Sequence, residues 1–223
     1  MSRAGYSGSG PGPITPDGCA VDLYSRLPVG DEPEIIATAV PPPASLLELG
    51  CGAGRVTRAL TKLGYAVTAV DESAEMLARV GGARTVRSAI EDLAMPGTFD
   101  VVMLASFLVH GPTAPALLQT CRRYVDYDGH VLIQREGAGW HTQVPRERPV
   151  ANGVARVLSD TEGPDGFHTV HVEYEFPDAH WTQKFRARPL TVEQFEALLH
   201  DAGLFVERYV TPDGTWVLAA PIV

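Results

Sequence analysis

The sequence has few of the features that mark secreted, membrane or zinc-binding proteins. Only three cysteines, Cys19, Cys51 and Cys121, occur in 223 residues, and their wide spacing gives neither a disulfide framework nor a zinc signature. We therefore predict no metal site and a reducing, cytoplasmic location. No apolar run approaches the ~18 residues that a transmembrane helix needs. The N-terminus lacks a basic segment followed by an apolar one, so we expect no signal peptide and no membrane partner.

Positive charge is also scarce. Lys and Arg number 18 against 27 Asp and Glu, which gives a formal net charge of −9. The basic groups at residues 122–123 and 146–148 are too short to follow a phosphate backbone, so nucleic acid is not expected as a partner. Hydrophobic residues make up 45% of the chain, which is enough for a full core in one domain or one domain with an insertion.

The composition divides the chain into five segments. Residues 1–18 are rich in glycine and proline, which predicts a flexible leader, with folding over a bound ligand as the alternative. Residues 19–44 predict an N-terminal helical cap made of two short pieces. Residues 45–135 form the predicted core, to which residues 189–223 add a helix and a terminal β-hairpin. Between them, residues 136–188 predict an antiparallel insertion with hairpin-like turns.

Strands and helices alternate in the core, which is typical of an α/β protein with a doubly wound parallel sheet. The predicted core strands lie at 45–49, 66–70, 84–87, 99–105 and 130–134, with helices at 56–63, 73–80 and 115–125. The insertion adds predicted strands at 154–158, 169–176 and 181–186. A helix at 191–202 follows, with Thr191 as its N-cap.

A glycine loop follows the first core strand. Gly50, Gly52 and Gly54 allow a ligand to approach the backbone, and the helix that follows offers free N–H groups. The G-x-G-x-G spacing differs from the G-x-G-x-x-G of a dinucleotide fingerprint, which disfavours a nicotinamide-dependent oxidoreductase. Glu48 would repel a pyrophosphate and suits an ammonium group instead. Asp71, at the end of the next strand, can accept hydrogen bonds from two ribose hydroxyls.

A ligand with a ribose and a cationic amino-acid tail is S-adenosyl-L-methionine, and the motifs resemble the class I S-adenosylmethionine-dependent methyltransferases. The resemblance covers roughly residues 20–219. It implies a Rossmann-like, seven-stranded sheet that is mostly parallel and ends in an antiparallel hairpin, with the antiparallel insertion after strand five. The matching segments are Glu48–Gly54, Val70–Leu77, Ile90–Leu93, Phe99–Ser106, Asp128–Ile133 and Ala202–Leu204.

The resemblance also implies residues that bind the cofactor. They line its methionine and ribose part (Glu48, Gly50, Cys51, Gly52, Gly54, Asp71), its adenine (Glu72, Met76, Ile90, Glu91) and its sulfonium (Ala105, Ser106), and Tyr24 covers the methionine end. Met76 is equally well explained as helix core. Ala89 stands where many relatives carry an acid, so either Glu91 or Asp92 substitutes for it, or backbone and packing hold the adenine.

Residues after strands four and five are candidates for the acceptor side. An amine acceptor needs only its neutral lone pair, whereas a hydroxyl needs a general base. His110 and His141 are the candidate bases, and a histidine that only hydrogen-bonds to backbone is the alternative for His110. The predicted substrate-binding residues are Phe107, His110, Trp140, Tyr174 and Trp181. The aromatic insertion suits a substrate lid, ordinary packing or dimerisation through its strands.

We therefore expect an enzyme that uses S-adenosyl-L-methionine to methylate an N or O atom of a small molecule, in natural-product metabolism. The small-molecule methyl acceptor is the expected partner, and a homodimer is an open alternative. A non-catalytic S-adenosylmethionine-binding or scaffold protein is the competing hypothesis.

Overall fold

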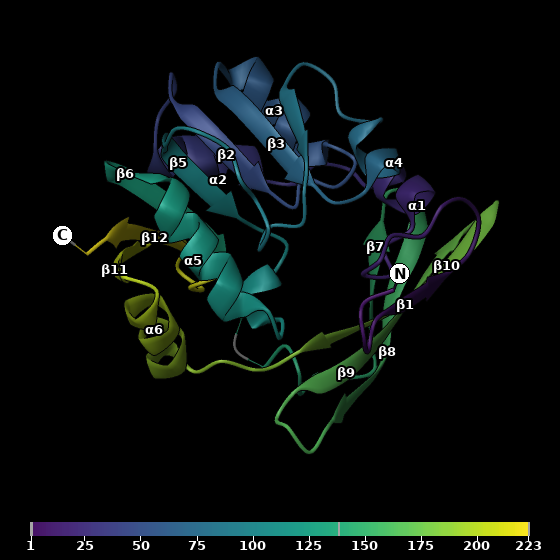
Figure 1. The fold of residues 1–223 in the computed structure, drawn as a ribbon. Coiled ribbons are helices and arrows are strands. Elements are labelled where there is room, and N and C mark those ends of the chain that lie inside the picture. The colour runs from purple at the N-terminus through teal and green to yellow at the C-terminus, as the bar shows by residue number, and fades with distance from the viewer. Residues whose placement is uncertain (1, 138, 223) are drawn as a thin grey trace. The chain divides into compact units, whose positions relative to one another are not determined.

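The computed structural model describes residues 2–137 and 139–222, and these residues divide into two compact units. One unit contains residues 29–137 and 190–222, and the other contains residues 2–28 and 139–189. Each unit has its own β-sheet (Figure 1). None of the helices within the described ranges is long and apolar enough to cross a membrane.

The first unit is built on a seven-stranded sheet with the strand order β11-β12-β6-β5-β2-β3-β4. Neighbours from β6 to β4 pair in parallel, whereas β12 and β11 are antiparallel. This confirms the doubly wound sheet with a C-terminal antiparallel hairpin. The strands are β2 (Ser45–Leu49), β3 (Ala66–Asp71), β4 (Arg84–Arg87), β5 (Phe99–Leu104), β6 (Val125–Gln134), β11 (Leu204–Tyr209) and β12 (Trp216–Pro221).

Helices cover both faces of this sheet because successive strand residues point to opposite sides. Leu47 and Leu49 pack in a core with residues of α5 and α6, whereas Leu46 packs in a second core with α2 and α3. Figure 1 shows α5 and α6 along the same face. The helical elements are α2 (Glu32–Ala39), α3 (Arg55–Leu63), α4 (Ala74–Leu77), η1 (Leu108–His110), α5 (Ala114–Tyr124) and α6 (Val192–Asp201).

Local sequence signals define the ends of two of these helices. Thr191 and Gln194 form a reciprocal capping box at the start of α6, with N–O distances of 3.2 and 3.0 Å. The helix predicted over residues 73–80 is shorter than expected. It ends at Leu77 with Ala78 as its C-cap, and the N–H groups of Arg79 and Val80 bond to carbonyls three residues back, as in a tight terminal turn.

The second unit is a five-stranded antiparallel sheet with the order β1-β10-β9-β8-β7, which confirms the predicted antiparallel insertion. Strand β7 was not predicted, since its sequence Arg-Glu-Arg-Pro-Val shows no apolar alternation. It lies at the sheet edge, where Pro149 is tolerated. The elements are β1 (Ser7–Ser9), α1 (Val21–Arg26), β7 (Arg146–Val150), β8 (Gly153–Glu162), β9 (His168–Phe176) and β10 (Ala179–Ala187).

The expectation of a flexible leader is wrong where the chain forms β1. Ser7, Gly8 and Ser9 pair with residues 182–184 of β10, although the segment is poor in apolar side chains. A Cβ on Gly8 would lie 2.0 Å from a backbone oxygen, so only glycine fits this contact. Tertiary pairing therefore orders a segment that its own composition would leave unfolded.

The helical cap predicted over residues 19–44 is also not one element. Helix α1 belongs to the antiparallel unit, where Leu23 packs in a core with Phe176 and Trp181. Helix α2 belongs to the seven-stranded unit, where Ile36 is fully buried. The break falls near Pro28, which, like Gly30 just beyond it, interrupts the helical pattern.

Candidate functional site

The glycine loop between β2 and α3 is a backbone cradle. Gly50, Gly52 and Gly54 have φ angles of 73°, 53° and 74°, a region that glycine adopts without steric cost. The N–H groups of Gly50 and Cys51 both donate to the carbonyl of Val70 at 2.9 Å, which anchors the loop to β3. A Cβ on Gly52 would meet nothing within 4 Å, so the backbone there faces open space. A ligand can approach the chain closely at this point.

Asp71 fixes the shape of this loop. Its carboxylate accepts the N–H of Gly52 through one oxygen and the N–H of Ser73 through the other, both at 2.9 Å. The side chain is half-buried at the end of β3, next to β2 in the sheet. An ionised carboxylate acts only as a hydrogen-bond acceptor, which is what a contact with the hydroxyl groups of a ligand requires. This geometry fits the predicted ribose contact.

Glu48 is the other acid beside the loop. It is 4% exposed, and the hydroxyl of Thr57 donates to it at 2.5 Å. Burial raises its pKa to about 7, against the opposing effects of the Thr57 hydrogen bond and the positive charge of Arg55. The carboxyl therefore titrates near neutral pH, and a cation beside it would favour its ionised form.

Of the predicted adenine-side residues, Ile90 lies against the same loop. Ile90 and Leu108 approach Gly50, since a Cβ there would lie 3.6 Å from Ile90 Cδ1 and 3.0 Å from Leu108 Cδ1. Met76 is 2% exposed, which supports its interpretation as helix core. Leu108 was not singled out from the sequence, because an apolar residue after a buried strand carries no signal of its own.

Backbone strain marks the segment after β5. Ser106 and Phe107 are consecutive non-glycine residues with φ angles of 55° and 60°, a conformation that costs of order 1 kcal/mol each and clusters at functional sites. The Ser106 N–H is held by the side-chain oxygen of Gln134 at 2.9 Å. Phe107 is 38% exposed, and Ala105 is half-buried before it. Gln134 was missed from the sequence, although it ends the strand adjacent to β5.

His110 lies on η1 and is buried against Glu136. The Glu136 N–H donates to His110 Nε2 at 2.9 Å, and His110 Nδ1 lies 3.5 Å from a Glu136 carboxylate oxygen. The two side chains are 2% and 3% exposed. An Nε2 lone pair that accepts a backbone hydrogen bond cannot take a substrate proton. The geometry therefore favours a linking role, in which His110 joins η1 to the segment that follows β6. Its role as a base stays a prediction.

The remaining predicted residues belong to the antiparallel unit. Trp181 is 1% exposed, donates its Nε1–H to the carbonyl of Pro11 at 2.8 Å and packs edge-on against Phe176. These contacts correct its predicted substrate role in favour of the packing interpretation. The Tyr24 hydroxyl donates to the side-chain oxygen of Gln183 at 3.3 Å. Burial raises the pKa of the Tyr24 phenol well above its usual range and that of Tyr174 to about 12.

His141 and Trp140 lie side by side at the start of this unit's second segment. Their rings pack edge-on with centroids 4.8 Å apart, and His141 Nδ1 lies 2.6 Å from a carboxylate oxygen of Asp160. Asp160 was not singled out from the sequence. Its partnership with His141, a turn residue 19 positions earlier, depends on the tertiary fold, which one sequence does not reveal.

Comparisons with known proteins agree with the site in the seven-stranded unit. Residues 47–133 match a family model described as a methyltransferase domain. The ubiquinone biosynthesis O-methyltransferase of Xanthomonas campestris pv. campestris (strain B100) is 34% identical over 128 residues. That alignment covers 52% of this chain and 53% of the relative, so the chain matches about half the length of this curated protein.

Solved structures share the fold at low sequence identity. The CcbJ methyltransferase from Streptomyces caelestis has a TM-score of 0.72 and 17% identity, covering 91% of this chain and 96% of that one. The sugar N-methyltransferase KedS8 from Streptoalloteichus sp ATCC 53650 has a TM-score of 0.63 and 16% identity, covering 85% and 84%. At this identity the likeness describes the fold alone.

Proposed function

We propose that this chain, whose residues 47–133 match the model of the methyltransferase domain family, is an S-adenosylmethionine-dependent methyltransferase. Its seven-stranded unit has the class I, Rossmann-like fold of these enzymes. The observation that carries the proposal is the clamp between Asp71 and Gly52, which holds an open glycine loop beside an acid able to accept ribose hydroxyls.

The residues of this site fit S-adenosyl-L-methionine. The open space over Gly52 gives the backbone room to approach a ligand, and the Asp71 carboxylate lies beside it, in contact with the N–H groups of Gly52 and Ser73. Glu48 is the acid that we assign to the ammonium end, since its pKa of about 7 lets a bound cation draw it into the ionised form. When bound, the cofactor supplies a methyl group activated by its sulfonium.

On the acceptor side, the chain's contribution is alignment. Ligands of doubly wound sheets bind beyond the carboxyl ends of the strands, where Ser106 and Phe107 follow β5 in their strained conformation. Holding two reactants in line can supply much of the rate acceleration of a transfer reaction. An amine acceptor then needs no base, whereas a hydroxyl acceptor would need one within hydrogen-bond reach.

We infer that the acceptor is a small molecule methylated at N or O. Support comes from the low number of Lys and Arg residues relative to Asp and Glu. It also comes from similar proteins whose names describe ubiquinone O-methylation and sugar N-methylation. A place in natural-product metabolism, a cytoplasmic location and the absence of nucleic-acid and membrane partners belong to the same proposal. A homodimer formed through the antiparallel unit stays an alternative to a monomer.

Two measurements test the proposal. Calorimetry should detect binding of S-adenosyl-L-methionine and S-adenosylhomocysteine, with NAD as the negative control. Transfer of a labelled methyl group should then be measured against a panel of small amines and phenols. Binding without transfer to any acceptor would support the non-catalytic alternative, and binding of NAD alone would contradict the cofactor assignment.

A further inference from the structure

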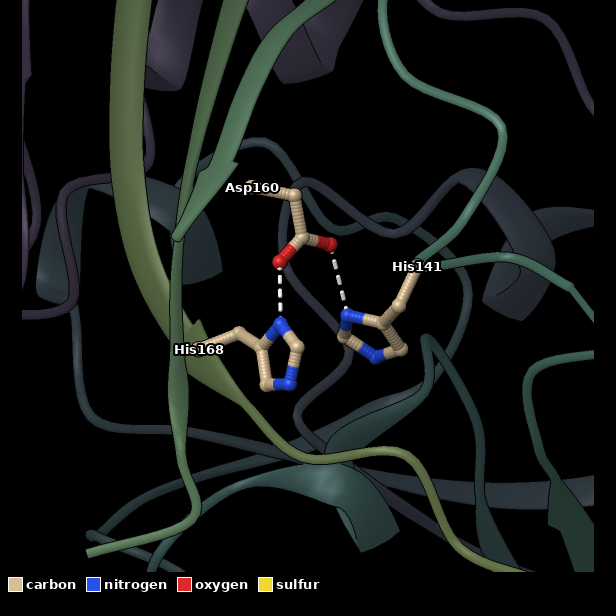
Figure 2. A group of neighbouring side chains, drawn as sticks. All are labelled: His141, Asp160 and His168. Carbon is tan, nitrogen blue, oxygen red and sulfur yellow. Dashed lines mark hydrogen bonds and ion pairs between the residues drawn. The ribbon is translucent and has the colours of Figure 1, made fainter. Parts of the chain in front are cut away.

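Two histidine side chains of the antiparallel unit converge on one carboxylate. One oxygen of Asp160 contacts Nδ1 of His141 at 2.6 Å, and the other contacts Nδ1 of His168 (Figure 2). The Asp160 side chain is 1% exposed, and those of His141 and His168 are 7% and 16% exposed. One ligand atom from each residue lies within 4.8 Å of the other two. We refer to these residues as the His-Asp-His cluster.

Strand register places Asp160 beside His168. Asp160 of β8 pairs directly with Val170 of β9, so His168 is its diagonal neighbour on the same side of the sheet. A register shift between Val157 and Ser159 inserts one residue, which turns Asp160 to the side occupied by the buried Val170. Without this bulge, the carboxylate would point to the opposite side.

A separate contact network fixes His141. The Arg146 guanidinium donates to the carbonyls of Trp140 and Gln143, at 2.6 and 2.9 Å, and lies 4.4 Å from the centre of the Trp140 ring. Trp140 in turn packs edge-on against His141. Both imidazoles are therefore held by their surroundings as well as by Asp160, and their ring centroids are 4.7 Å apart.

The contacts with Asp160 involve one nitrogen of each ring, Nδ1. When Nδ1 carries the proton that it shares with the carboxylate, Nε2 is the nitrogen of that ring that can coordinate a metal ion. Figure 2 shows both Nε2 atoms on the side of the rings away from Asp160. A carboxylate that holds Nδ1–H of an imidazole whose Nε2 binds a metal is a recurrent arrangement in metal sites.

We propose that Nε2 of His141 and Nε2 of His168 bind one divalent transition-metal ion, with Zn²⁺ as the best match, and that Asp160 orients both rings. Two imidazoles on one tetrahedral Zn²⁺, with Zn–N distances of about 2.0–2.1 Å, place their ring centres about 5 Å apart. The observed separation is close to this value. Water or a ligand atom would complete the coordination.

Direct ligation through the Asp160 contacts fits less well. Two ligand atoms on one tetrahedral Zn²⁺ lie about 3.3 Å apart, whereas Nδ1 of His141 and its Asp160 oxygen are only 2.6 Å apart, a hydrogen-bond distance. The thiols are also poor competitors for the ion, because burial raises the pKa of Cys51 far above its usual range and that of Cys121 to about 12.

Calorimetric titration of the full chain with ZnCl₂, after removal of bound metal by a chelator, tests this site. The wild type should bind one ion. His141→Gln and His168→Gln should each weaken binding at least ~10-fold, and Asp160→Asn should weaken it ~10–100-fold. His180→Gln, which changes a largely exposed histidine on β10, should bind like the wild type. Equal Zn²⁺ binding by the wild type and both His→Gln variants, or no binding by the wild type, would overturn the proposal.

A measurement on the unaltered protein covers the case in which a variant fails to fold. With ¹⁵N-labelled histidine, one equivalent of Zn²⁺ should shift the Nε2 resonances of His141 and His168 while their Nδ1 atoms keep their protons. Unchanged Nε2 resonances would show that the cluster is held by hydrogen bonds alone and would overturn the site. Neither readout depends on methyl transfer, so a failure here leaves the proposed function untouched.

Discussion

The carboxylate of Asp71 binds the N–H of Gly52 at 2.9 Å and so joins the end of β3 to the loop that leaves β2. Its other oxygen holds the N–H of Ser73, the residue that caps α4. A single side chain therefore sets the positions of two loops on one edge of the sheet. Substitutions at Asp71 should act both on ligand contacts and on the geometry of the loop.

We expect Asp71→Ala to weaken binding of S-adenosylhomocysteine by ~1–3 kcal/mol, because hydrogen bonds to a charged acceptor are lost. Calorimetry on the folded variant measures the change. Asp128→Asn, which changes an exposed acid on β6, is the matched control and should bind normally. Wild-type affinity in a folded Asp71→Ala protein would remove the ribose assignment.

Gly52 and Gly54 should respond differently to alanine. A Cβ at Gly52 meets open space, so Gly52→Ala should cost about 1–2 kcal/mol for its positive φ and should weaken cofactor binding by blocking close approach. A Cβ at Gly54 would lie 3.0–3.2 Å from the side chain and Cα of Val80, so Gly54→Ala should destabilise the fold more. Denaturation and calorimetry on both variants separate the effects. If the two variants lose cofactor affinity only in proportion to the stability that each has lost, the result would argue against a ligand over Gly52.

Glu48 should make stability depend on pH. Burial raises its pKa from 4.5 to about 7. The folded state therefore holds the Glu48 proton more tightly than the unfolded state does. The resulting contribution to the free energy of unfolding is fully present below about pH 4.5 and is lost as the pH rises through about 7. Glu48→Gln should remove a pH-dependent contribution on the order of 3 kcal/mol within this window. Urea denaturation of both proteins at several pH values measures it, and identical pH slopes would contradict the assignment.

His110 variants should distinguish a linking role from a catalytic one. His110→Ala leaves the buried Glu136 N–H without its acceptor, which should cost ~1–3 kcal/mol of stability. His110→Gln can restore an acceptor, so we expect it to recover most of the stability and to keep turnover within about 10-fold of the wild type. A folded His110→Gln protein with a ~10²-fold lower turnover would instead identify His110 as the general base.

The sequence was most informative where local signals and periodicity agree. The alternation of strands and helices predicted the parallel strands, and Thr191 as N-cap predicted the start of α6, because a cap bonds to the first turn of its own helix. The strand conformation of Ser7–Ser9 was not predictable in this way. Their partners lie in β10, and only the folded sheet brings the two segments together.

The same distinction holds for the site. Asp71 and the three glycines were found because the loop needs those residue types at that spacing. Gln134 and Asp160 were missed, because each contacts a residue that is distant in the chain and that only the fold brings close. For His110, position after a strand suggested chemistry, whereas its burial against Glu136 indicates a different role.

The pairing of β1 with β10 also constrains how the protein is made. The side-chain oxygens of Ser9 and Thr182 are 2.7 Å apart, but 173 residues separate them in the chain. At about 5–20 residues per second, a ribosome needs roughly 10–35 seconds to synthesise that interval. Strand β1 therefore waits for its partner until residues 182–184 of β10 have been synthesised. The antiparallel unit cannot assemble around its own N-terminal segment while the strands of the parallel sheet are still being synthesised.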